Sequence, residues 1–309
     1  MNYLILGSSG FIGKNLLNKI DKSKHTIRLF DRTNLNQKNY ENQNATNLQF
    51  VEGVFSPEYD FFELTKDIDV VYHLISTTIP SSSITLEEEL TENVFSTIKL
   101  LEACKINKVK KIIFLSSGGT VYGKSNGFPF KETDETNPIN SYGIQKLTIE
   151  KYIQLYFHLY QLDYRIIRLA NPYGPGQNPH QNQGIITKFA YNIVNNIPVK
   201  IFGQGDVIRD YIYIDDAIDG IIAIEQDQSG EKLFNLGVGQ GHTIKEIVST
   251  IENVSNKKFS IHYEEERKID VPYSVLDISR YLQIAPSNDF MSLEKGVSQL
   301  LTYFSKGAD

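Results

Sequence analysis

Tyr142 and Lys146 are the two residues of this sequence best suited to move a proton. They stand four positions apart in Tyr142-Gly-Ile-Gln-Lys146, which reads as the start of a helix and places both side chains on one helical face. A free phenol has a pKa of about 10, and a nearby ammonium favours its ionised form. The pair can therefore exchange a proton with an alcohol oxygen, and we expect Lys146 to lower the pKa of Tyr142 toward neutrality.

A second motif is suited to hold phosphate groups. The segment Gly7-Ser-Ser-Gly-Phe-Ile-Gly13 follows the apolar run Tyr3–Leu6 and opens the amphipathic stretch Phe11–Ile20. Glycines allow a tight turn, close approach of a pyrophosphate and close packing of helix on strand, and the helix N-terminus attracts anions. The sequence therefore predicts a dinucleotide site at the residues Gly7, Gly10, Phe11, Ile12 and Gly13.

Asp31 completes this half of the site. It follows the apolar run Thr26–Phe30 and stands eighteen residues after Gly13. A carboxylate at this place accepts hydrogen bonds from the adenosine ribose and repels a 2′-phosphate, which favours NAD over NADP. Arg32 is compatible with NADP as the less favoured cofactor, because an arginine can bind the 2′-phosphate. The alternative is that Arg32 is a solvent-exposed charge in a loop without a role in cofactor binding.

The elements that must position these residues alternate along the chain. Short apolar runs at Val70–Ile75, Ile112–Leu115 and Arg165–Leu169 are separated by the helical patterns Glu87–Cys104 and Ser141–Tyr160. Buried strands that alternate with helices predict an α/β fold with a doubly wound parallel sheet.

The residue composition of the chain changes after residue 170. Residues 171–180 are rich in Gly, Pro and Asn, which is typical of a loop or domain edge. Asp215 and Asp216 are expected to cap the N-terminus of the helix Ala217–Glu225, which they directly precede. The elements expected in this part are the helices Ile185–Asn195, Ala217–Glu225 and Thr243–Val254 and the strands Val199–Phe202, Arg209–Ile214 and Lys232–Leu236.

Composition excludes several classes of protein. The chain has 31 Lys and Arg against 37 Asp and Glu, a net charge of −6, which argues against general nucleic-acid binding. The single cysteine, Cys104, excludes an internal disulfide framework and a Cys-rich zinc module; we expect it in the core and expect no metal. No apolar run is long enough for a membrane span or a secretory signal, so a cytoplasmic protein is expected.

These motifs together resemble the extended short-chain dehydrogenase/reductase family, in its NAD-dependent nucleotide-sugar epimerase/dehydratase group, which contains UDP-galactose 4-epimerase. Besides the two motifs above, His73-Leu-Ile-Ser76, Asn93-Val-Phe-Ser-Thr97, Ser116–Gly123 and Arg168–Pro175 match the family in order along nearly the whole chain. The resemblance implies that His73, Leu74 and Asn93 also contact the cofactor.

The resemblance also implies two lobes between which the chain crosses more than once. The NAD-binding Rossmann domain would comprise residues 1–170 plus about 206–240. A smaller, mixed α/β lobe of about 171–205 plus 241–309 would bind a nucleotide-diphosphate sugar.

Arginines of the second lobe are suited to a diphosphate. Arg209 and Arg267 resemble the family's phosphate-binding arginines, with Asn171 beside them, and a planar guanidinium binds two phosphate oxygens at once. The alternative for each arginine is an ordinary ion pair, for instance with Asp210. Ser274 matches a position where a small residue would leave room for a 2-acetamido group.

The sequence departs from the family at Gly118, where most members carry the Ser or Thr that binds the reacting sugar oxygen. We expect Thr120 to supply the hydroxyl, since in an extended segment it would project to the same side, with Ser117 as the second candidate. Related 4,6-dehydratases place an Asp-Glu pair where this chain has Gly119 and Thr120, which disfavours that reaction.

The resemblance thus implies an NAD-dependent epimerisation at C4 of a nucleotide sugar, with Tyr142 and Lys146 as catalytic residues. Two alternatives stay open: an NAD(P)H-dependent reductase of a nucleotide-linked 4-keto-6-deoxysugar, and a non-catalytic dinucleotide sensor. Tyr152, Tyr156 and Tyr160 recur every four residues, and in the family this helix often forms a dimer interface, so a homodimer is expected.

Overall fold

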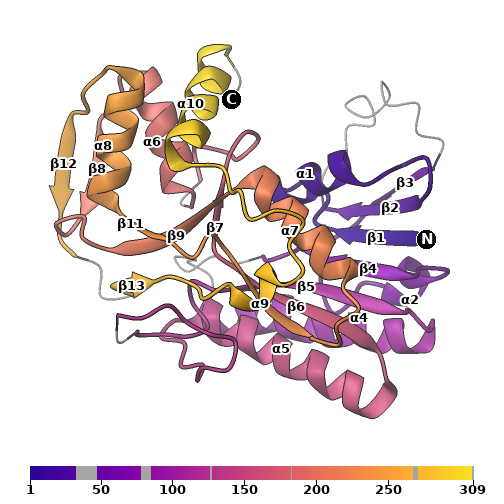
Figure 1. Cartoon of the computed structure of the whole chain (residues 1–309). Helices are drawn as coiled ribbons and strands as arrows, with labels where there is room; N and C mark the ends of the chain where they lie inside the picture. Colours follow the sequence, from indigo (N-terminus) through magenta and orange to yellow (C-terminus); the bar gives the residue numbers. More distant parts are fainter. Residues whose placement is uncertain (33–46, 78–84, 126, 182, 267–270, 308–309) are drawn as a thin grey trace. The chain divides into compact units, whose positions relative to one another are not determined.

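The computed structural model describes residues 1–32, 47–77, 85–125, 127–181, 183–266 and 271–307 (Figure 1). The chain divides into two compact units that each combine distant segments. Unit 1 consists of Met1–Ser116, Ser141–Ile167 and Ser229–Leu233. Unit 2 consists of Ser117–Asn140, Arg168–Gln228 and Phe234–Asp309.

Most residues of a seven-stranded sheet belong to unit 1. Its order is β10-β6-β5-β4-β1-β2-β3, and the pairs β1–β2, β1–β4, β2–β3 and β4–β5 are parallel. This arrangement, with helices packed on the sheet, confirms the predicted Rossmann-like α/β fold. The strands are β1 (Asn2–Leu6), β2 (Thr26–Asp31), β3 (Leu48–Glu52), β4 (Val70–His73), β5 (Lys111–Ser117), β6 (Asp163–Leu169) and β10 (Leu233–Leu236).

The core of unit 1 lies between one face of this sheet and its helices. Alternate strand residues such as Leu4, Leu6 and Phe114 are fully buried against Cys104 and Ile153, as the period of two in a strand requires. The expectation that Cys104 is a core residue is confirmed. The helices of this unit are α1 (Phe11–Lys19), α2 (Phe61–Thr65), α3 (Leu86–Glu89), the π-helical turn η2 (Leu90–Phe95), α4 (Ser96–Ile106) and α5 (Ser141–Tyr160).

The expected single helix over Glu87–Cys104 is interrupted in the structure. It consists of α3, η2 and α4, and the π-helical turn η2 inserts an extra residue into the helical ladder. Hydrophobic periodicity did not reveal this insertion, because a single wide turn leaves the three- and four-residue spacing on both sides nearly intact.

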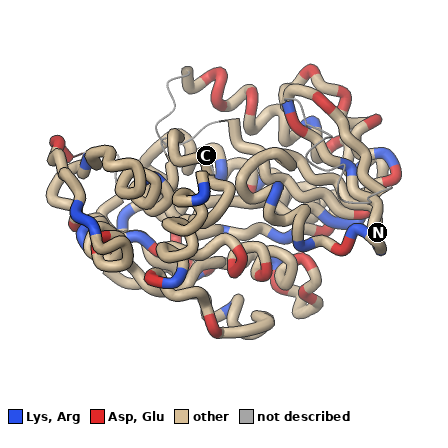
Figure 2. The backbone as a smooth tube through the Cα atoms, turned by 90° about the horizontal axis from the view of Figure 1, so that it is seen from above, with Lys and Arg blue, Asp and Glu red and all other residues tan. Residues whose placement is uncertain are grey.

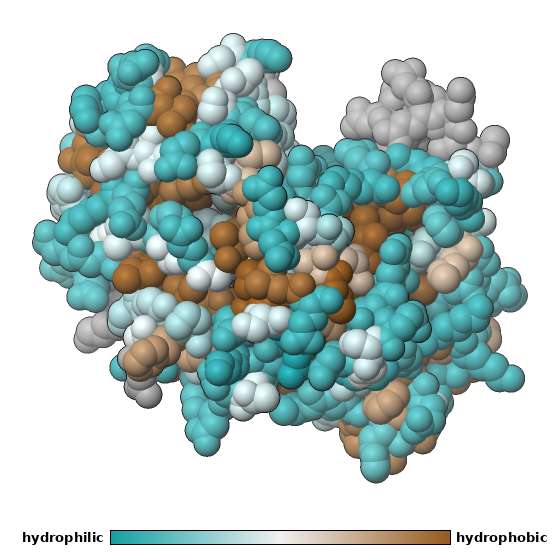
Figure 3. Space-filling model, viewed as in Figure 1, coloured by the Kyte–Doolittle hydropathy of each residue, from teal (hydrophilic) through white to brown (hydrophobic). Residues whose placement is uncertain are grey.

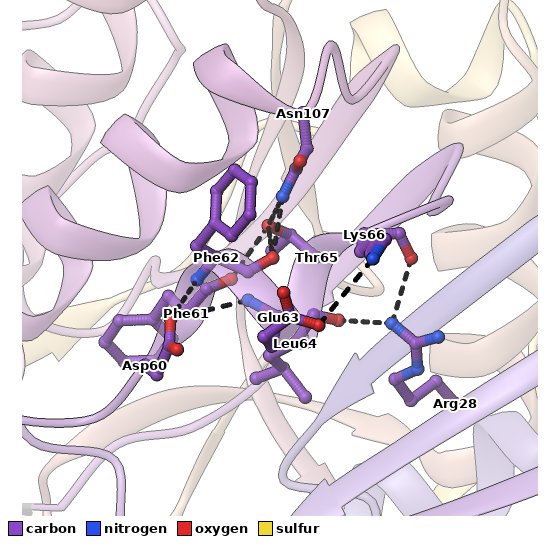
Figure 4. A network of polar contacts seen from close by, with 9 residues as sticks. All are labelled: Arg28, Asp60, Phe61, Phe62, Glu63, Leu64, Thr65, Lys66 and Asn107. Carbon is purple, nitrogen blue, oxygen red and sulfur yellow. Dashed lines mark hydrogen bonds and ion pairs between the residues drawn. The ribbon is translucent and has the colours of Figure 1, made fainter.

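Side chains from neighbouring elements hold the ends of the short helix α2 (Figure 4). The carboxylate of Asp60 accepts from two backbone N–H groups at the N-terminus. At the other end, Arg28 of β2 donates to the carbonyls of Leu64 and Lys66 at 2.7 and 3.0 Å. Asn107, just after α4, donates to the carbonyl of Phe62 at 2.7 Å. These bonds satisfy groups that a five-residue helix leaves unpaired, and they join α2 to the sheet.

Unit 2 is organised around β9, which pairs in parallel with β7 and β13 and antiparallel with β11. A separate parallel pair joins β12 to β8, and α6, α8 and α10 pack on one another. The strands are β7 (Asn171–Tyr173), β8 (Val199–Phe202), β9 (Ile208–Tyr213), β11 (Gly241–Thr243), β12 (Ile261–Glu264) and β13 (Tyr273–Ser274). The helices are α6 (Ile185–Val194), α7 (Ile214–Gln226), α8 (Ile244–Ser255), α9 (Ser279–Leu282) and α10 (Leu293–Ser305).

The expected capping role of Asp215 and Asp216 is wrong. Helix α7 begins at Ile214, with Tyr213 as its N-cap, so both carboxylates lie in the first turn. There they face the positive end of the helix dipole, and Asp216 also accepts a hydrogen bond from the backbone N–H of Met291 at 2.8 Å. Acidic residues are favoured both at the cap and in the first turn, which is why the sequence misplaced the helix start.

Along the residues that the structure describes, positions of Lys and Arg are interspersed with positions of Asp and Glu (Figure 2). Among the helices that the structure describes, none has the length and apolar character needed to cross a membrane. Within the same described residues, no three His, Cys, Asp or Glu side chains are grouped as metal ligands.

Candidate active site

The glycine-rich turn between β1 and α1 has the geometry of a phosphate-binding turn. Gly7 has a φ of +84°, and a Cβ on Gly13 would lie 2.2 Å from the carbonyl oxygen of Gly7. Only glycine therefore lets α1 begin this close to the strand. The N-cap Gly10 has no side chain to cap the first-turn N–H groups of Phe11, Ile12 and Gly13. These donors, at the positive end of the helix, fit an external phosphate.

Asp31, the last residue of β2, faces this turn. Its carboxylate accepts from the backbone N–H and the hydroxyl of Ser9 at 3.0 and 2.5 Å, and from the N–H of Arg32 at 2.7 Å. A carboxylate has about four acceptor positions, so Asp31 retains capacity for a ribose hydroxyl. Arg32 is exposed. The turn and Asp31 together fit the adenosine diphosphate part of a dinucleotide.

The predicted proton-transfer pair lies on the first turns of α5. Lys146 is buried, its Nζ donates to the carbonyl of Leu115 at 2.9 Å, and it lies 5.6 Å from the ring centroid of Tyr142. The structure thus brings the two side chains together, as their spacing predicts. They line one small cavity with His73, Ile75, Ser76, Asn93, Gln145 and Ile149.

Burial controls the protonation of both groups. It raises the pKa of Tyr142 to about 12, while a hydrogen bond with Ser76 acts in the lowering direction. The expectation that the pKa of Tyr142 falls toward neutrality is therefore wrong for the protein chain by itself, because desolvation disfavours the charged phenolate. Burial also lowers the pKa of Lys146 to about 8, and the negative charge of Glu150 opposes this effect.

Replacing Glu150 by Gln is expected to lower the pKa of Lys146 further, below about 8. The carboxylate of Glu150 favours the charged ammonium, so its loss removes the one influence that raises this pKa. The measurement is an NMR titration of the Lys146 side chain, assigned by its absence in Lys146→Arg. Glu92→Gln on η2 is the control, and an unchanged pKa in Glu150→Gln would contradict the assignment.

His73 is the last residue of β4 and Leu74 follows it, while Asn93 lies on η2 and contacts the loop after β4. His73 is buried, its Nε2 lies 2.9 Å from the hydroxyl of Thr97, and burial lowers its pKa to about 3, so it is neutral. The N–H of Leu74 donates to the carbonyl of Leu6 at 3.1 Å. These are the carboxyl ends of central strands, the edge at which open α/β sheets bind their ligands.

Two residues of this cavity, Ser76 and Gln145, are not among the residues predicted from the sequence. Ser76 contacts the hydroxyl of Tyr142, and Gln145 is a buried residue of α5 that contacts Asn93 of η2. A signal for both was available, since Ser76 ends the strand-end motif and Gln145 lies inside the Tyr142–Lys146 motif on a helical face that packs against the protein.

In unit 2, the segment after β5 contains the hydroxyl candidates. The N–H groups of Thr120 and Val121 both donate to the carbonyl of Ser117, at 3.3 and 3.2 Å, so residues 117–121 form a turn. The extended conformation assumed for Thr120 is therefore wrong. Its Oγ1 is nevertheless buried and has no hydrogen-bond partner among the residues that the structure describes.

Packing within unit 2 explains why residue 118 is a glycine. A Cβ at this position would lie 2.6 Å from Leu276 Cδ1 and 3.1 Å from the carbonyl oxygen of Arg168. The side chain of Leu276 thus fills the volume that a Ser or Thr side chain would need. Ser274 Oγ donates to the carbonyl of Gly118 at 3.4 Å, which holds the two segments together.

Three of the expected substrate-binding residues lie on neighbouring strands of unit 2. Asn171 is on β7, Arg209 on β9 and Ser274 on β13, and Ser274 is the register partner of Arg209. Asn171 donates to the carbonyl of Asp210 at 2.8 Å. The carboxylate of Asp210 accepts from the backbone N–H groups of residues 238, 239 and 276. Arg267 lies outside the described residues.

Comparisons with known proteins agree with this geometry. The model of the NAD dependent epimerase/dehydratase family matches residues 3–237. A dTDP-4-dehydro-6-deoxyglucose reductase of Escherichia coli is 32% identical over 96% of both chains. The crystal structure of a UDP-glucose 4-epimerase of Thermotoga maritima with UDP-glucose is 31% identical over 99% of both chains, with a TM-score of 0.89. A UDP-glucuronic acid 4-epimerase of Bacillus cereus with UDP-glucuronic acid and NAD is 27% identical over 99% of both, with a TM-score of 0.88. The chain belongs to the NAD dependent epimerase/dehydratase family.

Proposed function

We propose that this protein is an enzyme that epimerises C4 of a nucleotide-diphosphate sugar with NAD as its cofactor. The observation that carries the proposal is the pair formed by the half-buried Tyr142 and the buried Lys146, in the unit that also holds the glycine-rich turn. Solved relatives with this fold are UDP-sugar 4-epimerases, which supports a nucleotide sugar as the substrate.

Each candidate residue has one role in the proposed reaction. When bound, NAD supplies the group that accepts and returns the C4 hydride. Tyr142 removes the proton of the C4 hydroxyl and later returns it, and Lys146 holds a positive charge beside Tyr142. Thr120, or Ser117 in its place, binds the C4 oxygen. The diphosphate is held by Asn171, Arg209 and Arg267, and Ser274 leaves space for a 2-acetamido group.

Proton transfer needs Tyr142 in both protonation states. Because burial raises its pKa to about 12, Tyr142 is a neutral phenol at neutral pH. A further positive charge in the site, such as that of the oxidised nicotinamide ring, would lower the pKa of Tyr142 and let it lose its proton more readily. In the reverse half of the reaction the same phenol is already the acid that the 4-keto oxygen requires.

A second candidate function is NAD(P)H-dependent reduction of a nucleotide-linked 4-keto-6-deoxysugar. The Escherichia coli reductase at 32% identity supports it. So does the neutral state of Tyr142, because reduction needs only proton donation. The apolar Gly118–Leu276 contact also differs from the hydroxyl found at this place in most of the family.

One experiment separates the functions. The purified protein is denatured to identify any released cofactor, and the intact protein is incubated with UDP- and dTDP-linked sugars and 4-keto sugars. Epimerisation without added cofactor, together with retained NAD, supports the first function. Turnover only of 4-keto sugars with stoichiometric NAD(P)H would replace it by the second. If neither the wild type nor Tyr142→Phe turns over any of these substrates, the protein is a non-catalytic dinucleotide sensor.

We also propose that the protein is a homodimer through α4 and α5. The outer face of α5 exposes Ile144, Leu155 and Leu159, and α4 begins near the exposed Phe95 and ends at the exposed Ile106. Apolar residues reach the surface along the lower edge of Figure 3, where Figure 1 draws α5. Apolar faces on two packed helices suit a self-complementary contact between copies.

Leu155→Glu is expected to convert this dimer into monomers, because a carboxylate would be buried without a partner at the contact. Analytical ultracentrifugation of the wild type and the variant at micromolar concentration measures the change. Asn18→Glu, at an exposed position of α1 and outside α4 and α5, should leave the dimer intact. A wild-type protein that sediments only as a monomer would refute the dimer.

A further inference from the structure

Glu89, the last residue of α3, is a buried carboxylate with no role in the reaction described above. Only 4% of the residue is exposed. Its Oε2 accepts hydrogen bonds from the hydroxyl of Ser141 and from Nε2 of Gln145, the second at 2.7 Å. Both donors are neutral, although burying a carboxylate without a cation normally opposes folding. The carboxylate therefore requires an explanation.

The position of Ser141 explains how the charge is tolerated. Ser141 is the first residue of α5, which runs for 20 residues. The N-terminus of a long helix carries a partial positive charge, and a carboxylate placed there is stabilised. Glu89 thus comes from a different helix and binds two side chains at the N-terminal end of α5.

Asn93 extends the contact to the end of β4. It lies one turn after Glu89, on the π-helical turn η2, and its Nδ2 donates to Oε1 of Gln145 at 2.8 Å and to the carbonyl of Glu89 at 3.1 Å. Its Oδ1 accepts from the N–H of Thr77 at 3.0 Å. π-Helical turns are rare and occur frequently at functional sites. The bonds therefore join α3, η2, the loop after β4 and α5 at one point.

The hydrogen-bonded residues Ser141 and Gln145 are sequence neighbours of Tyr142 and Lys146. Ser141 immediately precedes Tyr142, and Gln145 immediately precedes Lys146. In an α-helix each residue adds about 100° of rotation and 1.5 Å of rise, so fixing two positions one turn apart fixes their neighbours as well. A displacement of about 1 Å in a reacting group can cost about a hundredfold in rate.

We propose that Glu89 is a positioning residue for proton transfer. Through Ser141 and Gln145 its carboxylate sets the rotation and axial position of the first turns of α5, and so places the hydroxyl of Tyr142 and the ammonium of Lys146. The effect on turnover rests on the proposed function, whereas the effect on the position of Tyr142 does not.

Two substitutions of Glu89 separate hydrogen bonding from charge. In Glu89→Gln, the amide oxygen can take the place of Oε2 and accept both bonds, so we expect kcat to stay within about threefold of the wild type. In Glu89→Ala both bonds are lost, and we expect kcat to fall by about 10- to 100-fold with KM changed less than threefold. Glu87→Ala, an exposed glutamate on the same helix, is the matched control.

Two results would overturn this proposal. An unchanged kcat in Glu89→Ala means that the contact does not position the pair. An equal loss in Glu89→Gln means that the negative charge, rather than the hydrogen bonds, is what matters. If Glu89→Ala does not fold, Ser141→Ala takes its place. It removes one of the two bonds to Glu89 and also the bond from Gln145 to the Ser141 hydroxyl, and leaves the bond from Gln145 to Glu89. An intermediate loss of kcat is expected, whereas wild-type kcat would count against the proposal.

A second measurement needs no substrate. In protein labelled with ¹³C at tyrosine Cζ, the Tyr142 resonance is assigned by its loss in Tyr142→Phe. We expect it to shift or broaden in Glu89→Ala or Ser141→Ala and to stay in place in Glu89→Gln and Glu87→Ala. A shifted resonance in a protein that turns over no nucleotide sugar would refute the proposed function and keep the positioning role. An unmoved resonance would refute the positioning role alone.

Discussion

Tyr142→Phe is expected to lower kcat by about 10³-fold while the protein keeps its fold and its cofactor. Positioned acid–base groups contribute about 10²- to 10⁴-fold, and among the described residues that line the cavity with Lys146, Tyr142 is the only phenol. The substitution removes one oxygen atom and keeps the ring. The change in volume is small, so a loss of activity can be attributed to the missing proton carrier.

The measurement is a steady-state assay on the substrate found in the panel, together with thermal unfolding and the amount of NAD released on denaturation. Tyr152→Phe on the same helix, whose side chain is partly exposed and does not line the cavity, is the control. A loss of less than about tenfold in Tyr142→Phe would show that another group transfers the proton.

Gly13→Ala is expected to weaken NAD binding by at least about 100-fold, which corresponds to about 2.7 kcal/mol. The new Cβ would lie 2.2 Å from the carbonyl oxygen of Gly7 and 2.8 Å from Cα of Ser8. Both neighbours are backbone atoms of the phosphate-binding turn, so α1 must move away from the turn that it completes. Overpacking of this kind also destabilises the fold by about 1–3 kcal/mol.

Isothermal titration calorimetry with NAD suits this chain, because it contains no tryptophan for a fluorescence assay. Asn18→Ala, at an exposed position of α1, should bind NAD as the wild type does. Wild-type affinity in a folded Gly13→Ala protein would show that the cofactor does not bind at this turn. Thermal unfolding separates this result from a loss of structure.

Local sequence patterns were sufficient where the physics is local. The glycine spacing of Gly7 to Gly13 predicted the turn, because backbone strain and the approach of α1 to β1 depend on residues within one turn of each other. The spacing of Tyr142 and Lys146 predicted that they share a helical face for the same reason. The alternation of apolar runs and helical patterns predicted the parallel sheet.

Other features depended on segments that are far apart in the sequence. The pKa of Tyr142 rises rather than falls, because the surroundings that desolvate it come from β4 and η2 as well as from α5. The turn at Ser117–Thr120 and the packing of Leu276 against Gly118 set the surroundings of Thr120 and leave no room for a side chain at position 118. The residue pattern around Gly118 does not reveal this contact with Leu276, and neither does the pattern around Leu276.

The fold class, the glycine-rich turn and the shared helical face of Tyr142 and Lys146 follow from the sequence, because each depends on contacts within a short stretch of chain. The protonation of these side chains and the contacts that support them follow from the tertiary structure. It showed the burial that sets the protonation of Tyr142 and Lys146, the π-helical turn η2, and the carboxylate of Glu89 at the start of α5. Burial and hydrogen bonding between distant segments exist only once the sheet and helices have packed together.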